Sequence, residues 1–178
     1  METIAIAVMS IDGCLTKHDI EGPGFASEAD QRFFSRSLRT FDCALMGGAS
    51  FRAARDRILA NPRPNHLRMV LTRDPSRFTA DAKPGELEFR SDAPAPAIRH
   101  LAARGLRRCA LVGGARLITG ALQAGLLSEL WITLEPVAFG EGSRLVEGRF
   151  EFAFDLLGTE ILGPSTLLLR YKPRARPT

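Results

Sequence analysis

Cys109-Ala110-Leu111-Val112-Gly113-Gly114-Ala115 is the stretch that decides the fold, because an apolar run ends in two glycines where a helical pattern begins. Such a stretch predicts a strand that stops, turns sharply and leads into a helix. Glycine has no Cβ, so it adopts positive φ at low cost and lets backbone amides approach a bulky anion. The free N–H groups at the start of the helix can then hold a phosphate.

A second stretch of the same kind lies upstream, where Cys43-Ala44-Leu45-Met46 leads into Gly47-Gly48-Ala49-Ser50 and an alanine- and arginine-rich helix. Glycine also makes tight strand-to-helix turns for packing alone, and that alternative stays open for each turn. Neither stretch is a Walker loop, and neither completes the dinucleotide fingerprint of an ordinary Rossmann domain. Two such turns in one small chain nevertheless favour a nucleotide ligand.

Length and composition favour one domain. The chain has 178 residues, 45% of them hydrophobic, which predicts a single domain over residues 1–172 with a sizeable core. Residues 173–178 are expected to form a mobile basic tail. No apolar run approaches the roughly 20 residues that span a bilayer, and the first residues lack the basic region of a signal peptide. We therefore expect a cytoplasmic protein that does not contact membranes.

Two further classes of ligand are disfavoured by composition. The three cysteines and three histidines are scattered and show no metal-ligand spacing, so no metal site is expected. The net charge of +4 comes from dispersed arginines, which favours a solvated basic surface over a nucleic-acid interface.

Apolar runs and helical patterns alternate along most of the chain. Strands are predicted at 3–9, 42–46, 67–71, 86–90, 109–112 and 129–137, and helices at 27–40, 51–59, 94–104 and around 117–122. Two last strands are predicted at 149–157 and 166–171, joined near Gly158 and Gly163-Pro164. This order predicts an α/β fold, a mixed and mostly parallel sheet of about eight strands with helices on both faces and an antiparallel C-terminal end. Ligands of such sheets bind beyond the carboxyl ends of the strands.

Four segments together resemble a known family. They are Ala7-Val8-Met9-Ser10-Ile11-Asp12-Gly13, Asp42-Cys43-Ala44-Leu45-Met46-Gly47 with Ser50, Leu111-Val112-Gly113-Gly114-Ala115, and Leu126-Leu127-Ser128-Glu129-Leu130 through Pro136-Val137-Ala138-Phe139-Gly140-Glu141-Gly142. In this combination the chain resembles, over essentially its whole length, the C-terminal reductase domain of the riboflavin-biosynthesis deaminase-reductase. The resemblance implies a dihydrofolate reductase-like fold, NADPH as cofactor, and hydride transfer from nicotinamide to a pyrimidine- or pterin-like heterocycle. The type activity of that family is 5-amino-6-(5-phosphoribosylamino)uracil reduction.

The resemblance also implies cofactor-binding residues. Gly47 and Ser50 would face the pyrophosphate region, and Thr72 and Arg73 would hold the adenosine 2′-phosphate. The second phosphate-binding turn would consist of Val112, Gly113, Gly114, Ala115, Arg116 and Leu117. A positive charge at Arg73 favours NADPH over NADH, although an arginine in this turn is also explained as an ordinary exposed residue.

Candidate substrate-binding residues are Ser10, Gly13 and Glu135, and candidate catalytic residues are Asp12 and Asp30. Asp12 is equally explained as a turn carboxylate that bonds local amides. Asp30 resembles the acidic residue with which dihydrofolate reductases bind the pterin amidine, but as the fourth residue of Ser27-Glu28-Ala29-Asp30 it also completes a helix cap. The proton for the reduction could equally come from water.

Substrate and assembly stay open. Ile6 stands where the riboflavin-pathway members commonly carry a lysine, four residues before the serine. Dihydrofolate reductase-type activity and a non-catalytic, nucleotide-binding regulatory protein are the alternatives. Phe150, Phe152 and Phe154 alternate in a predicted strand, which is consistent with an apolar face that forms a homodimer and also with side chains that fill the domain's own core.

Overall fold

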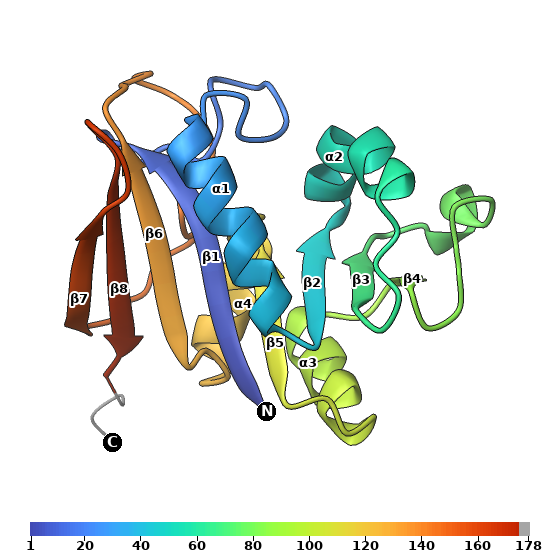
Figure 1. Ribbon diagram of the computed structural model, residues 1–178. Coiled ribbons are helices and arrows are strands. Elements are labelled where there is room, and N and C mark those ends of the chain that lie inside the picture. The colour runs from blue at the N-terminus through green and yellow to red at the C-terminus, as the bar shows by residue number, and fades with distance from the viewer. Residues whose placement is uncertain (175–178) are drawn as a thin grey trace.

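Strand β1, Glu2–Ser10, is buried on both faces, and the rest of the sheet is arranged around it. The other strands are β2 (Cys43–Gly47), β3 (Leu67–Leu71), β4 (Leu87–Arg90), β5 (Arg108–Val112), β6 (Glu129–Glu135), β7 (Phe154–Ile161) and β8 (Leu167–Pro173). In the computed structural model, which describes residues 1–174, they form one sheet in the order β4-β3-β2-β5-β1-β6-β8-β7 (Figure 1).

The first six strands of the chain are parallel, and β8 alone runs antiparallel to its neighbours β6 and β7. The mixed α/β sheet expected from the sequence is therefore confirmed. Because the carboxyl ends of parallel strands meet at one edge of a sheet, the segments that follow β1, β2, β3 and β5 gather along the upper edge in Figure 1.

Helices cover both faces of the sheet. They are α1 (Glu28–Ser37), α2 (Gly48–Ala60), α3 (Pro94–Ala103) and α4 (Ala115–Gln123), with short 3₁₀ segments at Leu38–Thr40 and Pro75–Phe78. Ile4 and Ile6 of β1 pack with Phe33 of α1 on one face, whereas Ala5 and Ala7 belong to the larger core under α3 and α4. Side chains on a strand alternate between faces, so this continuous apolar run supports two separate cores.

Strand β7 begins later than the sequence predicts. The predicted strand at 149–157 is wrong in its bounds, because residues 149–153 are irregular and the strand runs over 154–161. Phe152 and Phe154 pack against the main core, and the ring centroids of Phe150 and Phe152 lie 5.2 Å apart. Phe150 and Phe152 thus precede the strand, and Phe154 is its first residue. Gly158 lies at a bulge in the pairing with β8 and not in a turn.

The first two residues of the expected basic tail contact the domain. Pro173 is the last residue of β8, and the backbone N–H of Arg174 donates to the carbonyl oxygen of Ala153 at 2.8 Å. The guanidinium of Arg174 also pairs with Asp155 at 2.7 Å. Residues 175–178 lie outside the described part of the chain, and the mobility of the tail stays a prediction. Over residues 1–174, no helix is both long and apolar enough to cross a membrane.

Leu101→Ala tests the core beneath α3. Leu101 is fully buried in the main core cluster, and its truncation leaves a cavity that the packed strands below cannot fill. We expect the free energy of unfolding in urea to fall by about 3 kcal/mol. Ile20→Ala in the loop after β1, where the residue is 58% exposed, is the control and should change it by less than about 0.5 kcal/mol. Equal losses for the two variants would contradict this description of the core.

Candidate active site

The two glycine turns expected from the sequence meet at the upper edge of the sheet. Gly113 and Gly114 have φ of +73° and +89°, a conformation that L side chains rarely adopt. A Cβ added at Gly113 would lie 3.1 Å from the hydroxyl oxygen of Ser50, in the first turn of α2. The turn after β5 therefore faces the beginning of α2 at close range.

The helices at these turns begin without side-chain caps. Gly47 precedes α2 and Gly114 precedes α4, and neither helix has a side-chain hydrogen bond at its N-cap. The amides of a first helical turn have no partner within the helix, and the helix dipole makes this end favourable for negative charge. Both turns are consequently able to bind an anion through the backbone.

The side chains that follow Gly114 do not all face this turn. Leu117 is buried in the core under α4, and Ala115 is buried as well. The guanidinium of Arg116 is 85% exposed and pairs with Glu147 at 3.4 Å. If this segment binds a phosphate, the contacts of Ala115 and Leu117 come from their backbone.

A cavity of about 470 Å³ opens beyond the carboxyl end of β3. Its lining contains the predicted pair Thr72 and Arg73, and the remaining residues are Arg52, Asp74, Arg77 and Phe78. Three guanidinium groups and one carboxylate give this cavity a positive charge, which suits a phosphomonoester. Sequence analysis missed Arg52 and Arg77. Arg52 lies one helical turn after Gly48, a spacing that could have pointed to it.

Asp12 connects the turn after β1 to the loop after β6 through hydrogen bonds. One carboxylate oxygen accepts the hydroxyl of Ser10, and the other accepts the N–H groups of Phe139 at 2.9 Å and Gly140 at 2.6 Å. The hydrogen bond from Ser10 and the amide of Gly140 lower the pKa of Asp12 to about 2. Asp12 is thus held as an ionised acceptor, as the turn-carboxylate alternative requires, and its catalytic role stays a prediction.

The neighbours of Asp12 are held in the same turn. Ser10 is fully buried, and its hydroxyl oxygen accepts the N–H of Cys14 at 2.9 Å. Gly13 has φ of +85°, and its N–H donates to the carbonyl oxygen of Ser10 at 3.0 Å. The predicted contacts of Ser10 and Gly13 with a substrate stay predictions, since both residues already serve the turn.

A second carboxyl group, Asp30 on α1, is buried beside β6. Only 7% of the residue is exposed, and this burial raises the pKa of Asp30 to about 6. The nearby charge of Glu135 raises this pKa further, while the hydroxyl of Thr133 lowers it. The hydroxyl of Thr133 is fully buried, and apart from this interaction with Asp30 it has no hydrogen-bond partner in residues 1–174. An acid that titrates near neutral pH beside a buried hydroxyl with no further partner is typical of a ligand site.

Glu135 connects three elements under this site. One of its carboxylate oxygens accepts the backbone N–H of Ser27 at 2.9 Å, and the other accepts the hydroxyl of Thr166 at 3.0 Å. Ser27 is the N-cap of α1, and its hydroxyl accepts the N–H of Asp30 at 3.3 Å. The helix-cap alternative for this segment is therefore present, but it uses the backbone of Asp30 and leaves the carboxyl group to the site. With Glu135 only 2% exposed, its predicted contact with substrate stays untested.

The structure thus groups the candidate residues at three places along one edge. Asp30, Thr133 and Glu135 lie between α1 and β6, and the turn of Gly113 faces Ser50 at the middle of the sheet. The arginine cavity lies beyond β3. Thr133 was missed because, in the sequence, it is one residue of an alternating strand.

Comparisons with known proteins bear on the family and the fold of the chain. A family model described as the RibD C-terminal domain matches residues 3–168. No curated protein sequence matches the chain significantly.

Three solved structures illustrate the likeness of fold. A pyrimidine reductase-like protein from Corynebacterium diphtheriae has a TM-score of 0.77 at 18% identity, with 98% of this chain and 92% of that chain covered. A diaminohydroxyphosphoribosylaminopyrimidine deaminase/5-amino-6-(5-phosphoribosylamino)uracil reductase from Thermotoga maritima has a TM-score of 0.75 at 15% identity, with 97% and 56% covered. Dihydrofolate reductase from Enterococcus faecalis, complexed with NADP(H), has a TM-score of 0.66 at 16% identity, with 98% and 97% covered. The expected dihydrofolate reductase-like fold is confirmed.

Asp30→Asn tests the buried acid through the pH dependence of stability. The pKa of Asp30 is about 6 in the folded chain against an ordinary value of 3.8, so the folded state binds this proton more tightly. The wild type therefore loses stability between about pH 4 and 6, and the variant does not. We expect the two unfolding free energies in urea to agree below pH 4 and the variant to be about 2 kcal/mol more stable above pH 6.

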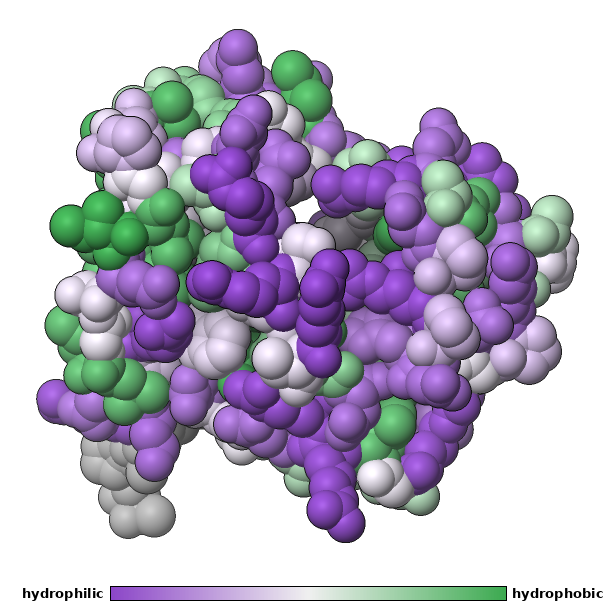
Figure 2. All heavy atoms as spheres, viewed as in Figure 1, coloured by the Kyte–Doolittle hydropathy of each residue, from purple (hydrophilic) through white to green (hydrophobic). Residues whose placement is uncertain are grey.

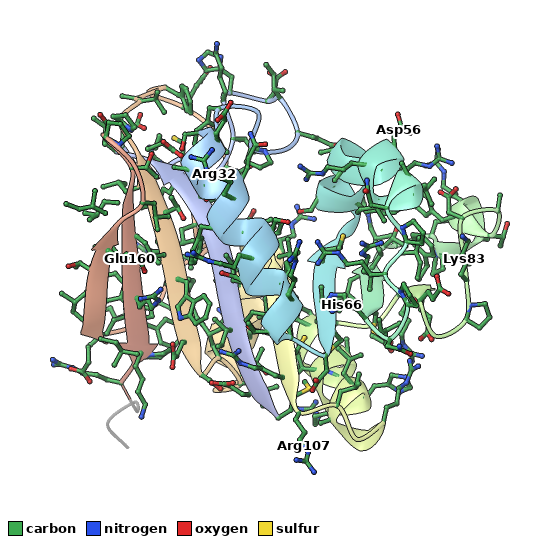
Figure 3. All side chains as sticks on the ribbon, viewed as in Figure 1. Arg32, Asp56, His66, Lys83, Arg107 and Glu160 are labelled. Atoms are coloured by element: carbon green, nitrogen blue, oxygen red, sulfur yellow. The ribbon has the colours of Figure 1, made fainter. Side chains whose placement is uncertain are left out.

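The control is Asp56→Asn at a fully exposed position on α2, which Figure 3 labels. Its difference from the wild type should stay near zero across the same pH range. A constant difference between wild type and Asp30→Asn from pH 4 to 8 would show that Asp30 is not held in an unfavourable ionised state.

Proposed function

Because the chain belongs to the RibD C-terminal domain family, we propose that it is an NADPH-dependent reductase of a pyrimidine- or pterin-like heterocycle. When bound, the reduced nicotinamide supplies a hydride. The protein's own contribution is to align the two reactants, exclude water and provide a proton. The Thermotoga structure bears the name of a reductase that acts on a phosphoribosylamino-uracil, which agrees with this class of substrate.

The observation that carries the proposal is the arginine cavity on the same sheet edge as the glycine turn. The turn at Gly113 and Gly114 offers backbone amides to a pyrophosphate, and Ser50 faces it across the edge. Thr72 and Arg73 line the cavity beyond β3, where the 2′-phosphate that distinguishes NADPH from NADH would enter. Without this phosphate the guanidinium groups of the cavity have no dianionic partner, which favours NADPH.

Asp30 and Thr133 support a heterocyclic substrate. The Asp30 carboxyl group accepts hydrogen bonds when ionised, and the Thr133 hydroxyl, which has no partner besides Asp30, can both donate and accept. Adjacent ring and amino N–H groups of a pyrimidine or pterin present the matching donors. Since its pKa is near 6, Asp30 can also hold a proton close to the reacting ring at neutral pH.

Ile6 limits how far the substrate can be named. The residue is buried under α1 in the apolar cluster with Phe33 and offers no charge to a substrate phosphate. We therefore propose the class of heterocycle and leave the phosphoribosyl group of the riboflavin intermediate as one member to be tested. The same Asp30–Thr133 pair would serve a dihydrofolate, so this substrate is the second candidate.

We also propose that the chain forms a homodimer through β7. This strand is an edge of the sheet and exposes Leu156, Leu157 and Ile161, the last to 80%. Figure 2 shows hydrophobic residues gathered on this side of the molecule. A long edge strand that exposes apolar side chains and unpaired backbone groups favours pairing with another strand. A second β7, related by a two-fold axis, provides both.

Arg73→Gln tests the cofactor. We expect the wild type to bind NADPH at least tenfold more tightly than NADH in a fluorescence titration, and the variant to lose about tenfold for NADPH only. Reduced-nicotinamide absorbance should then fall when a panel of pyrimidines, pterins and dihydrofolate is added. Tight binding without oxidation by any of these would favour the regulatory alternative, and no preference for NADPH would contradict the proposed cofactor site.

Ile161→Lys tests the dimer. A charge on each copy of the paired edge should be left unpaired, so we expect light scattering to report a dimer for the wild type and a monomer for the variant. Ile20→Lys, at a position 58% exposed in the loop after β1, is the matched control and should remain dimeric. A monomeric wild type would end this part of the proposal.

A further inference from the structure

The arginine cavity contains one guanidinium group that is already paired and two that are not. Over residues 1–174, Arg73 and Arg77 have no ion-pair partner, whereas Arg52 forms two hydrogen bonds with the carboxylate of Glu21. Asp74, the acidic residue of the lining, accepts the backbone N–H of Ser76 at 3.1 Å and also its hydroxyl. The lining thus leaves an excess of positive charge for an incoming anion.

The side chain of Arg52 reaches this cavity by passing beside Gly48. A Cβ added at Gly48 would lie 3.6 Å from an Nη atom of Arg52 and 3.5 Å from the Cβ of Thr72, which are ordinary contact distances. The guanidinium is therefore folded back along α2 and lies beside position 48. Arg52 and Thr72 approach the same space from different elements of the fold.

Glu21 comes from the loop between β1 and α1, which reaches toward α2 in Figure 1. Its carboxylate accepts the Nε–H of Arg52 at 3.1 Å and an Nη–H of the same guanidinium. Gly22, the next residue, has φ of +91°, and a Cβ there would lie 2.8 Å from the Cβ of Ala53. Two consecutive loop residues therefore contact α2: Glu21 through its ion pair with Arg52, and Gly22 through close packing against Ala53.

The first part of this loop is hydrogen-bonded to the segment that follows β6. The N–H of Leu15 donates to the carbonyl oxygen of Ser143 at 2.7 Å, and the N–H of His18 donates to that of Glu141 at 3.2 Å. The loop consequently spans from the segment after β6 to α2, across the carboxyl edge of the sheet. Figure 2 shows the surface hollowed between the parts that carry α1 and α2. Among the hydrogen bonds and ion pairs of residues 1–174, only those between Glu21 and Arg52 join this loop to α2.

We propose that the Glu21 carboxylate competes with the cofactor's 2′-phosphate for Arg52. When the phosphate pairs with Arg52, Glu21 loses its partner and the loop is released from α2. The proposal rests on the proposed function, because that function supplies the phosphomonoester. A phosphomonoester carries more charge than a carboxylate and presents three acceptor oxygens, so it pairs with Arg52, Arg73 and Arg77 together. Binding of the phosphate and detachment of Glu21 then favour each other by linkage.

The test compares NADP⁺ with NAD⁺, which differ only in the 2′-phosphate, by calorimetric titration of the full chain. Glu21→Gln should bind NADP⁺ about two- to fivefold more tightly than the wild type, as expected for the loss of an exposed ion pair, and NAD⁺ equally well. Arg52→Gln should bind NADP⁺ about tenfold more weakly. In the double variant, the gain from Glu21→Gln should disappear, because the guanidinium for which Glu21 and the phosphate compete is absent.

The control is Glu28→Gln, which removes the exposed ion pair between Glu28 and Arg32 on α1 and should change neither affinity. Arg32 is labelled on this helix in Figure 3. A second measurement follows the loop. Amide hydrogen exchange over residues 19–24 should rise in the wild type when NADP⁺ is added and should already be raised in Glu21→Gln without ligand.

The outcomes separate the two proposals. A wild type that prefers NADP⁺, with Glu21→Gln unchanged in affinity and exchange, overturns the role of Glu21 and leaves the cofactor assignment intact. A wild type that binds NADP⁺ and NAD⁺ equally overturns the cofactor assignment and, with it, the competition. A gain of affinity for both cofactors in Glu21→Gln also overturns the competition, because the effect would not depend on the 2′-phosphate.

Discussion

Burial of β1 on both faces is the constraint on which the other features depend. Its interior residues are apolar without interruption, so helices must cover the sheet from both sides. Neighbours β5 and β6 run parallel to it, and their connections cross the faces as helices. Every parallel strand then ends at the same edge, which places glycine turns, helix beginnings and arginines within reach of one extended ligand.

The two buried carboxyl groups beneath α1, Glu135 and Asp30, differ in how fully they are hydrogen-bonded. Glu135 is almost fully buried, and both of its carboxylate oxygens are used to hold Ser27 and Thr166. Asp30, one helical turn after the N-cap, is buried with only the hydroxyl of Thr133 beside it, and this hydroxyl has no other partner in residues 1–174. A buried carboxylate destabilises the fold unless hydrogen bonds compensate it. A ligand with N–H donors would supply the hydrogen bonds that the Asp30 carboxylate lacks.

Much of the fold was predictable because periodicity and glycine turns are local signals. The strands that begin near Thr3, Asp42 and Leu67 were found within a residue or two, and so was the helix predicted at 27–40. Helix α2 begins at Gly48, three residues before the predicted start at Phe51. The error at 149–157 arose because alternating phenylalanines have the pattern of a strand, whereas Phe150 and Phe152 lie before β7 and Phe152 packs against the core. Gly158 was expected in a turn, but it lies within β7 at a bulge in the pairing with β8.

The site was less predictable, since its residues meet only after folding. Thr72 and Arg73 were found because they directly follow a strand, at the edge where ligands bind. Arg52 was missed because its role depends on the direction in which a helical side chain folds, which the sequence does not show. Thr133 was missed because an isolated threonine in a strand has no distinguishing pattern.

The order of strands also separates the two ends of the proposed ligand path. The arginine cavity belongs to β3 and α2, whereas Asp30 and Thr133 lie between α1 and β6, with β2, β5 and β1 in between. Different clusters of core residues support α1 and α2. Substitutions around the heterocycle can therefore accumulate without repacking the nucleotide end. In chains of this architecture, the substrate could therefore change during evolution while the proposed hydride donor stays the same.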